Sequence, residues 1–376
     1  MSPEIMIQTF FAVKTANSAR LKGPTRAPCH IIFDLCRAWN SKPVPKGRKC
    51  RRKPVLKHYI VKRILGAIPV FFGITLIVFL MMNMAPATIA DAAGEGEASS
   101  AAMRAALEAN LGLDQPILVR YFLWLKEVLT GDLGLSYRTG QPVLRMIGQR
   151  VSPSLILTGT GVVWAILLGI PLGVLAAWKP KSGWNKVASG LTLFSFSTPS
   201  FFLCLIAIFL FSVKLSWFPA ANMYSTGAGG DLADLLHHLV LPAAIVCLGS
   251  LGNLIRQTTS AVSEVLGEDY IRTARAKGLG EWAVLWKHAF RTALIPVLTT
   301  ILNHIPHIIG GSMVVERIFG WPGMGSLLFS SVNGRDYTVI MGVTVVVALA
   351  VLVTGILMDI VYRLADPGVG WGGDRE

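Results

Sequence analysis

Long apolar stretches separated by short polar connections limit most strongly what this chain can fold into. A helix needs roughly 20 apolar residues to cross the ~30 Å hydrocarbon core of a bilayer, and six stretches come near that length or exceed it. Hydrophobic residues make up 53% of the chain and charged residues only 15%, with a mean hydropathy of +0.56. These features predict an all-α membrane protein with six transmembrane helices. The predicted spans are residues 61–84, 155–178, 187–213, 239–255, 293–315 and 339–362.

The formal net charge of +14 is concentrated before the first span. Residues 1–63 hold 15 Lys and Arg against 2 Asp and Glu, a net of +13, which leaves +1 for the rest of the chain. A basic segment directly before a span is typical of cytoplasmic retention and of contact with anionic lipid, so we expect a membrane-lipid partner and no nucleic acid. Scattered charges and prolines without a sustained period predict that residues 1–56 are a mostly disordered extension, while residues 369–376 are a short tail.

The short connections between spans carry a charge bias that predicts the orientation in the membrane. Those after the second and fourth spans hold nine Lys and Arg, whereas those after the third and fifth hold three. By the positive-inside rule both chain termini are expected in the cytoplasm of a bacterial cell, at its inner membrane. Residues 85–151, which include a predicted helix over 97–110, then lie outside; a connection this long is exempt from the charge rule.

The charged stretch 268–291 is predicted to form two short helices that meet at a glycine corner. Acidic residues begin the first helix, basic residues end it, and Gly278 can take the left-handed conformation that closes a helix. From this stretch alone, a surface-lying hairpin without a role is an equally good interpretation. The second helix is expected to bury an apolar stripe made of Trp282, Leu285, Trp286 and Ala289.

Motifs for catalysis, nucleotide binding and metal binding are missing from the sequence. No Gly-Lys dipeptide occurs, so no Walker A loop can hold a phosphate, and neither HExxH nor GxSxG is present. The five cysteines include no CxxC pair, which predicts neither a disulfide framework nor a zinc site. The chain is therefore expected to be no enzyme, and energy for any pumping must come from another protein.

Four motifs resemble one family. Residues 269–299, DYIRTARAKGLGEWAVLWKHAFRTALIPVLT, resemble the cytoplasmic EAA loop of ABC importer permeases, specifically the dipeptide/oligopeptide/nickel branch. Three other motifs resemble the same branch in the same order along residues 57–368. These are LGLDQP with GDLGLSYRTGQPV (111–116 and 131–143), VVERIFGWPGMG (314–325) and DIVYRLADP (359–367).

The resemblance implies a permease subunit of a binding-protein-dependent importer, with di- or oligopeptides as the implied cargo and residues 57–368 as the permease domain. Its implied partners are a homologous second permease, two cytoplasmic ATPase subunits and an extracytoplasmic substrate-binding protein. ATP and Mg would be bound by the ATPases and no cofactor by this chain. Family members dock the EAA loop into a cleft on the ATPase, which implies coupling roles for Glu268, Asp269, Tyr270, Arg272, Thr273, Ala274, Arg275, Ala276, Lys277, Gly278 and Leu279.

The loop departs from the general EAA pattern at two places. Arg272, Thr273 and Ala274 stand where that pattern has Glu-Ala-Ala, and 288–291 replaces its Ile-x-Leu-Pro. The peptide branch has similar substitutions, with a later proline, here Pro296. Docking is still implied, whereas the part that Arg272 plays is left open.

Several polar residues within the predicted spans are candidates for the translocation path, because such side chains usually face a bundle interior or a water-filled route. Interhelical hydrogen bonding is the equal alternative, and metal ligation lacks a third ligand. The candidates are Asn303, His304, His307 and Ser197. Asp359 and Arg363 are expected to form an i,i+4 pair. Aromatic side chains near span ends are expected at the membrane interface: Trp217, Trp321 and Tyr337.

Two other functions remain open from the sequence. A permease for nickel or another small solute would carry the same motifs. A stand-alone secondary transporter would need no ATPase, but such proteins usually place charged residues at mid-membrane, and central Asp, Glu, Lys and Arg are missing from these spans.

Overall fold

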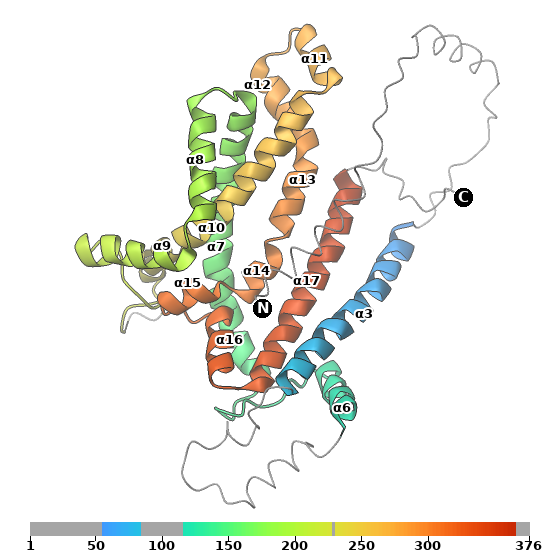
Figure 1. The fold of residues 1–376 in the computed structure, drawn as a ribbon, viewed down its shortest axis with the longest axis vertical. Helices are drawn as coiled ribbons and strands as arrows, with labels where there is room; N and C mark the ends of the chain where they lie inside the picture. Colours follow the sequence, from blue (N-terminus) through green and yellow to red (C-terminus); the bar gives the residue numbers. More distant parts are fainter. Residues whose placement is uncertain (1–54, 84–115, 228–229, 366–376) are drawn as a thin grey trace, which may run out of the picture. The chain divides into compact units, whose positions relative to one another are not determined.

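The computed structural model describes residues 55–83, 116–227 and 230–365, which are mostly helical and contain no named strand (Figure 1). The fold described below is that of the unit beginning at residue 56. The predicted helix over 97–110, the tail 369–376 and nearly all of the predicted N-terminal extension lie outside the described residues.

Five helical segments of the described chain are long and apolar enough to cross a bilayer, and a bent pair of helices makes a sixth if both halves belong to one span. The all-α membrane fold is therefore confirmed. Two of the six predicted spans, the third and the fifth, are not continuous helices. The five segments are Leu65–Met82, Val143–Trp178, Leu232–Leu266, Glu281–Ile318 and Tyr337–Val361.

Helices α7 (Val143–Trp178) and α10 (Leu232–Leu266) form the largest helix contact in the fold. Glycines on α7 let the two backbones approach. A Cβ atom on Gly161 would lie 2.6 Å from Val246 Cβ, and one on Gly173 would lie 2.7 Å from Thr258 Cβ. A Cβ atom on Gly169, between these two glycines, would lie 3.1 Å from Leu254 Cβ, and Pro171 lies inside α7 without ending it.

The third predicted span, over 187–213, is a bent pair of helices and not one continuous helix. Helix α8 (Gly183–Ser197) and helix α9 (Ser200–Ala207), which continues as the π-helix η2 (Ile208–Lys214), meet at 102°. Thr198 is extended at φ −101° and ψ 121°, because a following proline disfavours the helical conformation. Ser195 donates its hydroxyl to Leu248 O on α10.

The fifth predicted span is also interrupted. It consists of α13 (Arg291–Leu302), α14 (Ile305–Gly310) and α15 (Met313–Ile318). The first break is a turn at residues 303–304, and the second follows Gly311, whose φ of +76° no regular helix accommodates. Helix α16 (Met324–Asn333) and the last helix α17 (Tyr337–Ala365) complete the chain.

Helix α3 (Val55–Asn83) packs against α6 (Ile117–Leu129) through an aromatic cluster, and Thr75 Oγ1 lies 2.9 Å from the Tyr121 hydroxyl. Towards the start of α3, Arg63 Nε lies 2.8 Å from Asp359 Oδ2 of α17. Asp359 is buried, and its carboxylate pairs with a cation from another helix. The side chain of its predicted partner, Arg363, lies outside the described residues, so that pair stays a prediction.

The α7–α10 contact yields a prediction about helix packing. Gly173→Ala is expected to destabilise the protein by about 1–3 kcal/mol, because the new methyl group meets Thr258 and the backbone carbonyl of Ile255, which cannot move aside cheaply. Thermal unfolding in detergent measures the change. The matched control is Gly190→Ala on α8, where a Cβ atom meets nothing within 4 Å and alanine favours the helix. Equal unfolding temperatures for the two variants would contradict the close contact.

Candidate functional site

A helical hairpin follows α10 at one end of the bundle (Figure 1). Its first arm is α11 (Asp269–Ala276), and Gly278 follows with a φ of +78°. Its second arm begins as α12 (Glu281–Ala283) and continues as the π-helix η3 (Val284–Phe290). The predicted first helix and its left-handed closing glycine are confirmed.

A small apolar core joins the two arms. Ile271 and Ala274 of the first arm pack against Val284 and Ala289 of the second, and all four side chains are buried. Ala274, one of the residues implied to couple to an ATPase, therefore makes its close contact inside the hairpin. The hairpin is thus a preformed unit that keeps its shape through its own core.

Polar contacts tie the corner of the hairpin to α7. Arg275 Nε donates to Glu281 Oε1 at 3.0 Å, across the turn that contains Gly278. Trp178, the last residue of α7, donates its indole N–H to Glu281 Oε2 at 3.3 Å, and its ring lies 5.4 Å from that of Trp282. The end of α7 and the hairpin therefore lie at the same end of the bundle.

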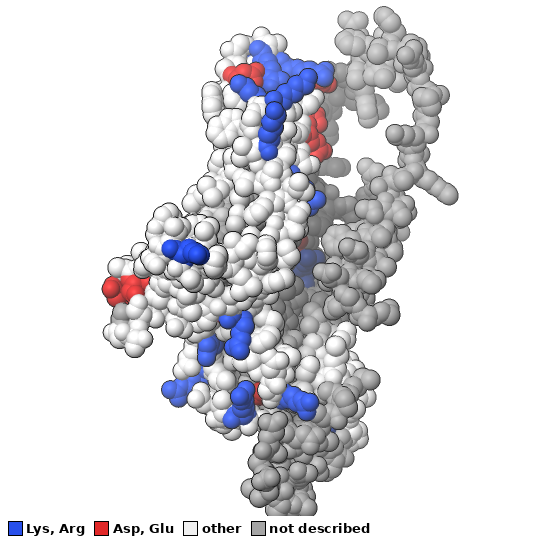
Figure 2. Space-filling model, turned by 60° about the vertical axis from the view of Figure 1, so that its left-hand side comes forward, with Lys and Arg blue, Asp and Glu red and all other residues white. Residues whose placement is uncertain are grey.

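The outer surface of the hairpin is exposed and rich in charge. Figure 2 shows Lys and Arg gathered at the end that carries it, with fewer acidic side chains between them. Of the residues predicted to couple to an ATPase, only Ala274 is buried, and the others are exposed and free to meet a partner: Glu268, Asp269, Tyr270, Arg272, Thr273, Arg275, Ala276, Lys277, Gly278 and Leu279. Arg272 forms a solvent-exposed pair with Asp269 at 3.4 Å.

The apolar stripe predicted for the second arm is only partly right. Leu285 and Ala289 are buried as expected, but Trp282 is 58% exposed and Val284, which was not predicted, is fully buried. A π-helix takes more residues per turn than an α-helix, so the buried face shifts away from the i, i+3, i+4, i+7 positions.

The polar residues predicted to line a translocation path are not all on neighbouring elements. Asn303 and His304 form the turn between α13 and α14, and the rings of His304 and His307 are 6.5 Å apart. His304 Nε2 is buried without a hydrogen-bond partner in the described part of the chain. Ser197 ends α8, which packs on α7 and α10, whereas α14 packs on α7 and α17. No group of three or more metal-ligating side chains occurs among the described residues.

A second ordered site, which the sequence did not predict, lies at the opposite end of α7. Glu316 is completely buried; it accepts a hydrogen bond of 2.7 Å from Ser154 Oγ and one of 2.9 Å from Ser326 N. Ser154 Oγ in turn accepts from Met324 N at 2.6 Å. The carboxylate thus ties the turn between α15 and α16 to α7.

Glycines and a tryptophan complete this turn. A Cβ atom on Gly323 or Gly325 would lie within 3.1 Å of the Glu316 carboxylate group, so only glycine fits around it. Trp321 is 1% exposed and donates its indole N–H to Pro153 O at 2.9 Å, which corrects its predicted place at the membrane interface. The sequence signal that could have indicated the burial of Glu316 is the set of glycines that follow it in 316–325. A buried lone carboxylate needs backbone donors close to it, and glycines allow that approach.

Two family models match this chain. The family model "Binding-protein-dependent transport system inner membrane component" matches residues 169–371, and the model for the N-terminal part of such membrane components matches residues 56–158. The first match includes the hairpin and the turn around Glu316.

Three relatives match this chain over most of its length and over nearly all of their own. The oligopeptide transport system permease protein AppB of Bacillus subtilis is 40% identical over 315 residues, which covers 83% of this chain and 98% of that protein. The dipeptide transport system permease protein DppB of Alkalihalophilus pseudofirmus is 34% identical over 329 residues, with the same coverage. A peptide permease protein of Brucella suis is 37% identical over 314 residues, again covering 83% and 98%. An inward-facing structure of the MetNI methionine ABC transporter is 17% identical with a TM-score of 0.48, covering 59% of this chain and 96% of that one.

The buried carboxylate generates a prediction about stability. Glu316→Ala is expected to lower the free energy of unfolding by several kcal/mol, and with it the unfolding temperature. Ser154 Oγ and Ser326 N lose their shared acceptor, and each unpaired buried group costs about 1–3 kcal/mol. Thermal unfolding in detergent and limited proteolysis of the α15–α16 turn are the measurements. Glu127→Ala on α6, which removes an exposed carboxylate, is the control. An unfolding temperature for Glu316→Ala within error of that control would refute the anchoring role.

Proposed function

The chain belongs to the family of binding-protein-dependent transport system inner membrane components, and from this premise we propose that it is one permease subunit of an ATP-driven importer for di- or oligopeptides. It is an integral membrane protein and a transport subunit. The observation that carries the proposal is the exposed, preformed hairpin at residues 268–291, fixed to the ends of α7 and α10.

The hairpin suits the docking of an ATPase subunit for physical reasons. Its own apolar core keeps its shape, so a partner that binds it loses little entropy in ordering it. Basic residues outnumber acidic ones over 268–291, five to three, which favours an acidic cleft on the partner. Because the second arm runs directly into α13, a displacement of the docked hairpin would move the spans. That is the lever by which ATP-driven closure would switch the permease between inward-open and outward-open states.

The hairpin end is proposed to be the cytoplasmic end, with both termini on that side. Trp178 and Glu281 bring the α7–α8 connection and the hairpin to one end, so their basic residues are on the same side of the membrane. A concentration of Lys and Arg in short connections marks the cytoplasmic side. The basic residues are Lys179, Lys181, Lys186, Arg272, Arg275, Lys277, Lys287 and Arg291.

The proposed complex contains a homologous second permease, two ATPases that bind ATP and Mg, and a substrate-binding protein on the outer side. The names of the relatives support peptides over nickel as the cargo, since all three concern peptide, dipeptide or oligopeptide transport. Co-purification from membranes is the direct test of this assembly. Peptide uptake by the chain alone, without an ATPase, would instead support a secondary transporter.

The corner glycine gives a prediction about coupling. Gly278→Trp is expected to lower both ATPase co-purification and peptide uptake at least tenfold, because the bulky side chain and the strained φ of +78° alter the docking surface. Gly140→Trp is the matched control: Gly140 has a φ of +67°, is equally open, and lies in the connection before α7, at the opposite end of that helix. The control should retain the ATPase. Normal uptake and assembly in Gly278→Trp would refute the proposal that the docked hairpin couples the ATPase to the spans.

The fifth span gives a prediction about the path. Alanine at His304 and His307 is expected to change the rate of peptide uptake severalfold while the complex still assembles, because a buried imidazole nitrogen without a protein partner is available to water or substrate. Uptake into proteoliposomes and co-purification are measured together, with His237→Ala near the start of α10 as the control. If uptake is unchanged, the two histidines serve packing only.

A further inference from the structure

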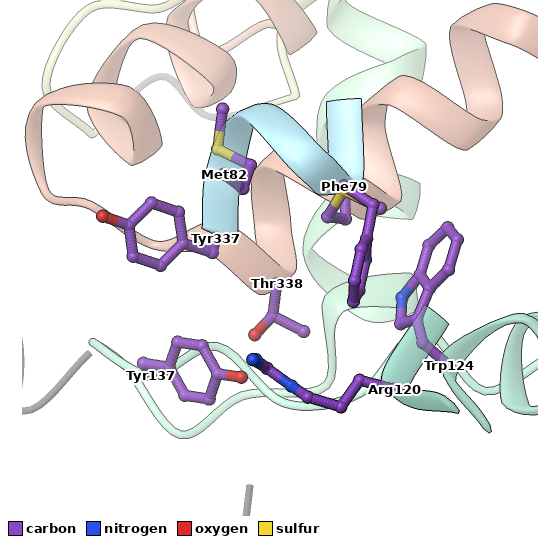
Figure 3. A pocket seen from close by; sticks show the side chains of 8 residues that line it. Phe79, Met82, Arg120, Trp124, Tyr137, Tyr337 and Thr338 are labelled. Carbon is purple, nitrogen blue, oxygen red and sulfur yellow. The ribbon is translucent and has the colours of Figure 1, made fainter. Parts of the chain in front are cut away.

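A small pocket lies where α3, α6 and α17 meet (Figure 3), at the end of the bundle away from the hairpin (Figure 1). Its volume is about 90 Å³, which is room for several waters or for one phosphate-sized group. The candidate spans of α3 and α17 are Leu65–Met82 and Tyr337–Val361, and the pocket is lined by residues at the end of the first and the start of the second. It therefore lies at the depth where the hydrocarbon core gives way to lipid headgroups.

The lining changes from apolar to polar in the way that a headgroup boundary requires. Phe79, Met82 and Met341 line the side formed by the spans. Trp124 and Tyr137 line the side formed by α6 and the connection before α7, and Trp and Tyr rings favour this interfacial depth.

Two polar side chains that line the pocket lack partners in the described chain. Arg120 forms no side-chain ion pair or hydrogen bond there, and its guanidinium extends into the pocket beside Tyr137 and Thr338 (Figure 3). Burial lowers the pKa of Arg120, an effect that Tyr137 opposes, but the guanidinium stays charged at neutral pH. Thr338 Oγ1 is buried without a hydrogen-bond partner, while the methyl group of Thr338 packs towards Gly134. A cation and a hydroxyl donor thus face one small cavity that no acidic side chain of the described residues lines.

Helix α6 also exposes an apolar stripe that can contact lipid. Leu118, Phe122 and Leu129 are 60%, 63% and 73% exposed and lie on one stripe of the helix. Tyr121 and Leu125, on the adjacent stripe, are buried against α3. An amphipathic helix beside the ends of two spans is suited to lie in the membrane interface, so the pocket that it covers is accessible to lipid.

We propose that this pocket binds the phosphate group of a phospholipid, with Arg120 as the cation, Thr338 as a hydrogen-bond donor and the lipid chains outside on the exposed apolar surfaces of α3 and α6. Arginine matches phosphate geometry, and the desolvated site strengthens the charge interaction. The bound lipid would fasten α3 and α6 to α17 at the end where no direct ion pair does so among the described residues. The site does not depend on the cargo or on the ATPase.

Native mass spectrometry of the full-length chain with its partners, extracted in mild detergent, tests the proposal. The wild type should retain phospholipid, Arg120→Gln should retain at least tenfold less, and Thr338→Val a few-fold less. Lys126→Gln, which removes an exposed charge from the same helix, is the matched control and should retain as much as the wild type. In a thermal titration, added phospholipid should raise the unfolding temperature of the wild type and not that of Arg120→Gln.

Two competitors distinguish the sources of the anionic group. Neither millimolar inorganic phosphate nor a substrate peptide should displace the retained lipid. Displacement by phosphate would indicate a site for free anions, and displacement by peptide would indicate a cargo site. Either result would overturn the proposal. Equal lipid retention by the wild type and Arg120→Gln would also overturn it. If Arg120→Gln does not fold, Arg120→Lys serves instead, since a point charge without the planar fork should retain severalfold less lipid. Because no transport is measured, these outcomes are separate from any failure of the importer proposal.

Discussion

Close packing of α7 on α10 through glycines is the contact on which the rest of the structure depends. Where Gly161 and Gly173 face α10, the two helices are so close that not even a methyl group would fit between them. The pair therefore behaves as one rigid body. Both ordered sites are attached to α7: Ser154 contacts Glu316 and Trp178 contacts Glu281. These two contact residues are about 36 Å apart along a straight helix. A rigid body of this length can relate events at one membrane face to those at the other.

The two ends are held by different forces. At the Glu316 end, a buried carboxylate with several donors makes a turn that is costly to open, since removing a partner leaves buried groups unpaired. At the hairpin end, Arg275 and Glu281 are 40% and 49% exposed, so their pair contributes at most about 1 kcal/mol. The apolar core around Ile271 and Val284 therefore keeps the hairpin folded, while its attachment to α7 can yield when a partner binds.

Features set by local chemistry could be predicted from the sequence, and features set by tertiary contacts could not. Apolar length indicated where spans lie, and Gly278 indicated the corner, because both depend on neighbouring residues alone. The 102° bend at Thr198 was missed because hydropathy measures composition and not direction. The burial of Glu316 depends on Ser154, more than 160 residues away, and Asp359 pairs with Arg63 on a different helix. Such partners become visible only when helices are packed.

The central claim is that the hairpin is the surface on which an ATPase subunit docks. A photo-crosslinking amino acid introduced at Lys277, exposed beside the corner glycine, tests it in intact membranes that contain the partner subunits. The same probe at Thr139, exposed in the connection before α7, reports the opposite end. The account predicts that illumination joins the Lys277 probe to an ATPase subunit and that the Thr139 probe never reaches one. A Lys277 probe that crosslinks no ATPase in an assembled, transporting complex would contradict it.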